Sequence, residues 1–159
     1  MSYRSLRVTL ACILVVSTCA LSDAVGQTNV HRIDVSNERT GSAPVDFEFL
    51  RTGEGEIGKW MVVPDATAIA KVSIEHLSED KTERRFSVAA YKPLSAKNLA
   101  VLARVKVIEG TMQSAGLAVR AQDCNNYYVV SSNTLEGRID LFRVVNGKSN
   151  RVGGPMQML

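Results

Sequence analysis

Residues 116–145 read GLAVRAQDCNNYYVVSSNTLEGRIDLFRVV and are followed directly by NGK. Short runs rich in valine, leucine and tyrosine alternate here with groups of Asn, Asp and Gly, which is the pattern of β-strands separated by turns. The pair Asn146-Gly147 is typical of a two-residue type I′ hairpin turn. The stretch therefore predicts three strands, at about 117–121, 127–132 and 139–145, and a return segment after the turn.

The same pattern continues toward the N-terminus. Along residues 100–107 every second residue from Val101 is apolar, whereas Arg104 and Lys106 lie on the opposite face. Residues 74–85 are rich in charge and fit either a solvated helical turn or a long loop, and we expect the loop. No helix of useful length is indicated, so the predicted class is all-β, an antiparallel sandwich or jelly roll. The further predicted strands are 47–50, 60–63, 67–74, 86–91 and 100–107.

The N-terminus has the layout of a secretory signal peptide. Arginines precede an uncharged apolar run at 8–21, and small residues follow up to Gly26. We expect cleavage after Gly26 and a secreted or periplasmic location. A membrane-spanning helix needs roughly 20 apolar residues, more than this run has, so no membrane span is expected after cleavage. A lipid anchor on Cys19 is a third reading, which Thr18 fits poorly.

Composition and charge bear on the class of partner and on the domain organisation. The chain has 159 residues, with 19 Lys and Arg against 16 Asp and Glu. No basic block concentrates this charge, so a nucleic-acid partner is not expected. After processing only Cys124 remains, and the domain therefore has no internal disulfide. We expect a signal peptide at 1–26, a flexible polar lead-in at 27–44 and one domain at 45–159.

The C-terminal end is apolar. After a Gly-Gly-Pro sequence at 153–155 come Met156, Met158 and Leu159. Two facing sheets bury both of their inner faces, whereas eight strands with an uncovered final hairpin look like part of a larger sandwich. We therefore expect the jelly roll to be incomplete and C-terminally truncated.

The stretch 116–148 resembles the concanavalin-like jelly-roll domains of the keto-disaccharide hydrolases and of relatives of glycoside hydrolase family 16. The shared pattern is a strand ending in Arg-x-Gln-Asp, an Asn-Asn-Tyr-Tyr turn, and a Leu-aromatic-basic-Val-Val strand that closes on Asn-Gly. GEGEIGKWMVVP, RFSVAAY and SAKN match earlier parts, so the resemblance covers about residues 47–152. It implies a lectin/glucanase-type fold and a carbohydrate or glycoside as ligand.

A catalytic site is not identified. Retaining glycosidases need two carboxylates about 5 Å apart, and enzymes of this fold type place them in a Glu-x-Asp-x-Glu strand, which this sequence lacks. Glu54 and Glu56 lie among glycines and are expected in a solvated loop. Glu79, Asp80 and Glu83 are expected to be surface charges. The catalytic residues therefore remain unknown.

A binding site is easier to suggest. Guanidinium, amide and carboxylate groups beside an aromatic ring are suited to sugar hydroxyls. The alternative is that residues 123–126 form a simple β-turn whose side chains bond the local backbone, while the tyrosines pack in the sheet. An ion pair of Arg138 with Asp140 is equally compatible with the pattern, and Trp60 fits either a core or a sugar-stacking role. The candidate ligand-binding residues are Arg120, Gln122, Asp123, Asn126, Tyr128 and Arg138.

No cofactor is expected. Calcium at Asp123 with Asn125 is the one oxygen cluster worth testing, and zinc is not expected because His31, His76 and Cys124 do not complete a site. Three functions follow as alternatives: a glycoside-acting hydrolase domain, a non-catalytic carbohydrate-binding module on the same fold, or an inactive fragment of a longer protein.

Overall fold

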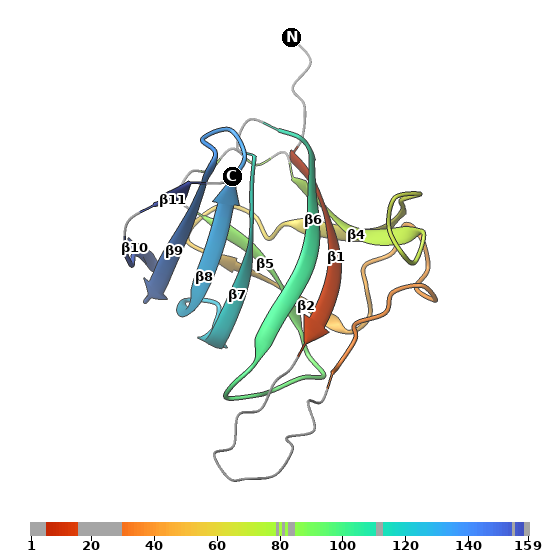
Figure 1. The fold of residues 1–159 in the computed structure, drawn as a ribbon, viewed down its shortest axis with the longest axis horizontal. Helices are drawn as coiled ribbons and strands as arrows, with labels where there is room; N and C mark the ends of the chain where they lie inside the picture. The colour runs from red at the N-terminus through yellow and green to blue at the C-terminus, as the bar shows by residue number, and fades with distance from the viewer. Residues whose placement is uncertain are drawn as a thin grey trace.

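The chain folds into antiparallel β-sheets (Figure 1). This computed structural model describes residues 6–15, 30–78, 80, 82, 85–110, 113–153 and 155–157, and no helix is present among them. The all-β prediction is confirmed for these residues. The strands are β1 Leu6–Val15, β2 Phe47–Thr52, β3 Lys59–Pro64, β4 Val72–Ser78, β5 Phe86–Tyr91, β6 Ala100–Glu109, β7 Ser114–Asp123, β8 Asn126–Asn133, β9 Arg138–Val145, β10 Lys148–Arg151 and β11 Met156–Gln157.

The strands form two sheets and a ribbon. The first sheet has the order β3-β4-β1-β6, and the second has the order β10-β9-β8-β7, with β11 also paired to β9. Strands β2 and β5 form a separate two-stranded ribbon. Figure 1 shows β6 of the first sheet beside β7 of the second, with the ribbon behind them. The hairpin predicted at Asn146-Gly147 is confirmed, since both residues have positive φ and Val145 pairs with Lys148.

One face of the ribbon packs on the second sheet. Tyr127, Val129 and Val144 are buried there, and Phe86 and Val88 of β5 pack against them. The register explains this core, because Tyr127 is directly opposite Val144 on the neighbouring strand and both side chains point to the ribbon. Burial of these large apolar side chains contributes roughly 1.5–3 kcal/mol each.

The other face of the ribbon packs on the first sheet. Phe49 of β2 stacks on Trp60 of β3 with ring centroids 6.3 Å apart, and Trp60 lies 4.6 Å from His76 of β4. Val62 and Ile74, on the same sheet face as this pair, are almost completely buried. The ribbon is therefore covered on both sides, and Trp60 takes part in packing against Phe49 and His76.

Thr52 links the ribbon to the second sheet by hydrogen bonds. Its hydroxyl donates to the carbonyl oxygen of Cys124 at 2.6 Å. A hydroxyl has one hydrogen, so the Tyr127 hydroxyl must donate to Thr52 Oγ1 across the other 2.6 Å contact. Thr52 is 1% exposed.

Replacing Thr52 by valine is therefore expected to destabilise the protein by about 1–3 kcal/mol, because it leaves the buried Tyr127 hydroxyl and the Cys124 carbonyl without their partner. Urea unfolding measures the change. Thr52→Ser, which keeps the hydroxyl, is the matched control and should lose clearly less. Equal losses in the two variants would mean that the methyl group, not the hydrogen bonds, stabilises this contact.

Two predictions between β3 and β5 are wrong. The strand predicted at 67–74 begins only at Val72, because residues 65–71 form turns that end with Lys71 at a φ of 59°. The loop predicted at 74–85 does not start at Ile74, since β4 runs on to Ser78. His76 is consequently a buried strand residue, 6% exposed. The charged residues that follow in the sequence indicated a loop, although both faces of β4 are covered.

The two faces of β7 differ in burial. Ala118 pairs with the buried Val129 and shares its sheet face, yet Gly116 and Ala118 are both exposed. Leu117 and Val119 lie half-buried on the opposite face. The core under the ribbon therefore includes residues of β8 and β9 and none of β7 among the described residues.

The N-terminal strand lies in the segment for which the sequence predicts a signal peptide. Strand β1 is paired on both sides within the first sheet. Residues 30–44 contain no strand, and Gly41 and Ser42 exchange backbone hydrogen bonds with Val62 of β3. Within the described residues, no helix is long and apolar enough to cross a membrane. Removal of residues 1–26 stays a prediction.

Candidate functional site

The six candidate ligand-binding residues do not gather in one place. Asp123 and Asn126 lie at the β7–β8 turn, whereas Arg138 begins β9 at the far end of β8, opposite Asn133. Tyr128 and Asn133 are five residues apart on one strand, which corresponds to roughly 17 Å. Arg138 therefore does not extend the surface formed by the turn.

The carboxylate of Asp123 is used within its own turn. It accepts the backbone N–H of Asn125 at 2.7 Å, and both of its oxygens lie 3.0 Å from the side-chain amide nitrogen of Asn126. The Asn125 hydrogen bond holds the pKa of Asp123 below its usual value, with the Asn126 amide adding to the effect. Asn126 Oδ1 in turn accepts the N–H of Asn146. These contacts match the alternative in which residues 123–126 form a simple β-turn.

The residues just before this turn are irregular. The register of β7 shifts between Val119 and Asp123, and Arg120 has a φ of 54°, which is uncommon for a residue with a side chain. Arg120 and Gln122 are both exposed. Neither side chain is buried between the sheets. No described contact holds Arg120 or Gln122 in a fixed position for a ligand.

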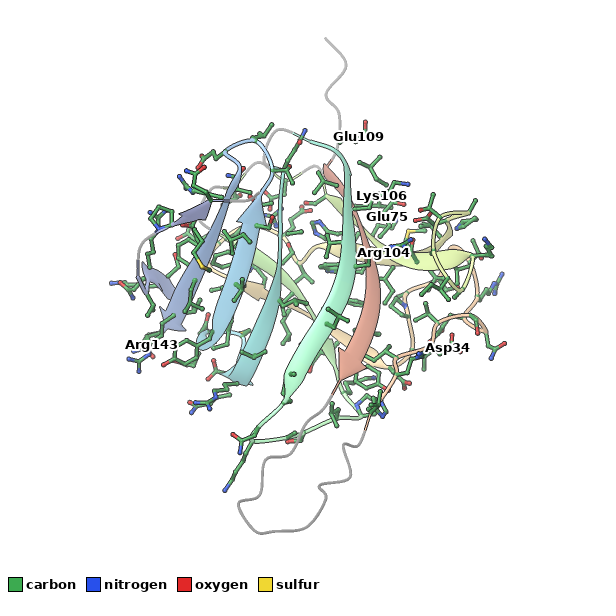
Figure 2. All side chains as sticks on the ribbon, viewed as in Figure 1. Asp34, Glu75, Arg104, Lys106, Glu109 and Arg143 are labelled. Carbon is green, nitrogen blue, oxygen red and sulfur yellow. The ribbon has the colours of Figure 1, made fainter. Side chains whose placement is uncertain are left out.

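Tyr128 lies on the outer face of the second sheet, away from the ribbon. It is opposite Arg143 in the register, and the Arg143 guanidinium carbon is 5.9 Å from the centre of its ring. Figure 2 labels Arg143 at the edge of the body on the side of the second sheet. One face of the Tyr128 ring is thus covered by a cation.

A second polar group is built on the inner face of the same sheet. Asp140 of β9 is 4% exposed, and its Oδ2 accepts a hydrogen bond from Arg138 Nε at 2.8 Å. Its Oδ1 lies 3.2 Å from Arg151 Nε on β10. Ser131 of β8 is directly opposite Asp140. We call Ser131, Arg138, Asp140 and Arg151 the Asp140 cluster.

Aromatic rings adjoin the Asp140 cluster. Arg151 is opposite Phe142, with its guanidinium carbon 5.9 Å from the ring centre. Phe142 is 6.1 Å from Phe86 of the ribbon. Small residues continue the same face onto β7, where Gly116 is opposite Ser131 and is exposed. A carboxylate, two guanidinium groups and a hydroxyl thus lie beside aromatic rings on one face.

Positively charged side chains surround the carboxylate of the Asp140 cluster. Two guanidinium groups contact Asp140, and the hydrogen bond that Arg138 donates to Asp140 raises the pKa of Arg138 above its already high value. Arg138 also pairs with the Glu136 carboxylate. The arrangement can accept and donate hydrogen bonds to hydroxyl groups.

The other polar groups give little support for chemistry. Glu54 and Glu56 are exposed in a loop, as predicted. Among the residues that the structure describes, no three His, Cys, Asp or Glu side chains gather closely enough to hold a metal ion. At the calcium candidate, the Asn126 amide nitrogen rather than an oxygen faces Asp123.

Sequence reasoning found part of the Asp140 cluster. The pair of Arg138 and Asp140 follows from their spacing of two on one strand. Arg151 was missed, although the two-residue turn at 146–147 fixes its position: if residue 145 faces 148, then 142 faces 151. Ser131 needed the β8–β9 register, which the four-residue turn region between those strands does not determine.

Comparison with known proteins adds no relative. No protein-family model, no curated protein and no solved structure matches this chain.

Proposed function

We propose that this protein is an exported, jelly-roll-type β-sandwich domain that binds carbohydrate at the Asp140 cluster. The observation that carries the proposal is a buried carboxylate held between two guanidinium groups beside aromatic rings, on the inner face of a sheet. Sugars present hydroxyl groups in fixed directions and apolar patches of C–H groups, and this combination of side chains complements both.

The jelly-roll assignment and export rest on the sequence. The resemblance to concanavalin-like domains extends over about residues 47–152, and its final Arg-x-Gln-Asp to Asn-Gly segment corresponds to β7, β8 and β9. Antiparallel sheets packed around a ribbon are compatible with a sandwich. The apolar N-terminal stretch supports a secreted or periplasmic location.

Binding is favoured over hydrolysis by the contacts of the two carboxylates. A glycosidase of the usual kind needs one carboxyl group with a raised pKa as acid and a second carboxylate as nucleophile or base. Asp140 and Glu136 both form ion pairs with Arg138, so each carboxylate is already engaged by a side chain of the protein. The hydrolase function therefore rests on the resemblance alone, whereas the binding function also rests on the Asp140 cluster.

Binding is tested with a panel of disaccharides, their 3-keto derivatives and polysaccharide fragments, using the full chain. Arg151→Ala and Asp140→Asn are each expected to weaken binding by about tenfold to 100-fold, as for the loss of a charge-assisted hydrogen bond. Arg151 is partly exposed on an edge strand, so its variant should stay folded.

Arg120→Ala and Arg143→Ala are the matched controls, because they remove a guanidinium outside the Asp140 cluster. If Arg120→Ala abolishes binding and Arg151→Ala does not, the site is at the β7–β8 turn. Release of free sugar from a 3-keto-glycoside would establish the hydrolase function. No binding across the panel would favour an inactive fragment.

A further inference from the structure

Strand β1 is an interior strand of the first sheet. Its residues pair antiparallel with Ile74 to Ser78 of β4 on one side. On the other side they pair with β6, in continuous register from Val8–Val107 to Val15–Ala100. Both neighbours thus direct backbone N–H and C=O groups toward the position of β1 (Figure 1).

Without residues 6–15, β4 and β6 would each present a row of unpaired backbone groups. The two strands would be separated by twice the inter-strand spacing, about 10 Å, which is the width of one missing strand. With β1 in place, β4 is an interior strand and residues 73–76 are buried. Natural sheet edges are instead protected by exposed charges, prolines or bulges.

We propose that the space between β4 and β6 is a strand-acceptor site. Residues 6–15 fill it in the unprocessed chain, and an extended segment of another polypeptide fills it once the predicted signal peptide is removed. This is β-strand addition, in which main-chain hydrogen bonds give affinity and alternate side chains give specificity. The proposal does not depend on carbohydrate binding.

The neighbours define the chemistry of the incoming strand. It must run antiparallel to both β4 and β6 and offer about eight residues, the length of the continuous register. Its inward side chains meet Ile74 and the apolar face of β6, so they must be apolar. In the register, the position of Thr9 lies between Glu75 and Lys106.

The position of Thr9 has a negative side chain on one side and a positive one on the other, so a charge of either sign would gain from one neighbour what it loses to the other, whereas a neutral hydroxyl can donate to one and accept from the other. A small neutral polar residue fits. Figure 2 shows the labelled Glu75, Lys106 and Arg104 near one another beside β1 and β6. The expected partner is therefore an extended segment with alternating apolar and small polar residues.

The test uses the full chain, produced without export, with a protease site inserted between Gly26 and Gln27. After the folded protein is cut, a fluorescent peptide of residues 6–15 with a lysine tail is added. The peptide should replace the N-terminal fragment with one peptide per chain, and amides of β4 and β6 should remain protected from hydrogen exchange.

Two peptide variants test whether binding depends on backbone pairing. Thr9→Pro removes an N–H and adds a bulky ring in the middle of an interior strand, so its binding should be at least about 100-fold weaker. Thr9→Ser keeps the backbone and a hydroxyl, and should bind like the unchanged peptide. In the uncut chain, the Thr9→Pro substitution should likewise lower amide protection in β4 and β6.

The proposal is overturned if the fragment leaves and β4 and β6 stay equally protected without it, because no strand is then needed. It is also overturned if the peptide fails to enter, or if the cut chains pair with one another and exclude the peptide. Unfolding on loss of the fragment, reversed by the peptide, would support it.

Discussion

Between pH 6.5 and pH 4 the free energy of unfolding is expected to fall by as much as about 3 kcal/mol, because His76 would have to become charged inside the core. Burial lowers the pKa of His76 from 6.5 to about 4, and the nearby Arg85 guanidinium lowers it further in the same direction. His76 Nε2 is buried and has no hydrogen-bond partner among the described residues, which fits a neutral imidazole.

The free energy of unfolding falls as the pH falls because the unfolded chain binds more protons than the folded protein. The unfolded chain, with a histidine pKa near 6.5, binds more protons in this range than the folded protein, whose His76 has a pKa of about 4. The stabilisation is therefore complete above pH 6.5 and is lost as the pH falls toward 4. Asp80, whose pKa is held low chiefly by its hydrogen bond with Thr82, affects stability only at more acidic pH.

Urea unfolding at several pH values between about 7.5 and 4 measures this effect, with His76→Gln as the comparison. The glutamine variant is less stable at neutral pH through altered packing against Trp60, but its stability should change little between pH 6.5 and 4. If the variant loses stability with pH as steeply as the natural protein, His76 is not the group that titrates.

Replacing Gly116 by alanine is expected to destabilise the protein by about 1–3 kcal/mol, the range for forcing extra atoms into a tight contact. A Cβ atom at this position would overlap the backbone carbonyl oxygen of Val130 and crowd the Cα of Ser131. Backbone atoms of a paired strand cannot move aside as a side-chain end can. The β7–β8 pairing would have to separate locally.

Ala118→Ser is the matched control, because Ala118 lies two residues along the same strand and face and is exposed. It should unfold at nearly the same urea concentration as the natural protein. Gly116→Ala should also weaken carbohydrate binding, since Gly116 is opposite Ser131 of the Asp140 cluster. Unchanged stability of the Gly116→Ala protein would contradict a tight contact between β7 and β8 at Gly116.

The strand pattern was readable from local sequence wherever turns are marked by Asn, Asp or Gly. β5 was predicted to the residue, and the hairpin at Asn146-Gly147 was found because only a few residues accept positive φ. The start of β4 was missed because Lys71, which no local rule places at positive φ, ends the preceding turns. Such conformations are selected by tertiary packing.

Long-range arrangement was less accessible. An apolar run preceded by arginines is compatible with both an export signal and an interior strand, and composition does not distinguish these two alternatives. The burial of Tyr127, Val129 and Val144 depends on where the β2–β5 ribbon packs, which is a contact between distant segments. The Asp140 cluster joins β8, β9 and β10, so it becomes visible only when their registers are known.

The most direct test of the proposed site is amide hydrogen exchange of the full chain, with and without the sugar that binds best in the panel. Binding at the Asp140 cluster predicts slower exchange at residues 131, 138–140 and 151. Slower exchange confined to residues 120–128, with binding unaffected by Arg151→Ala, would contradict it.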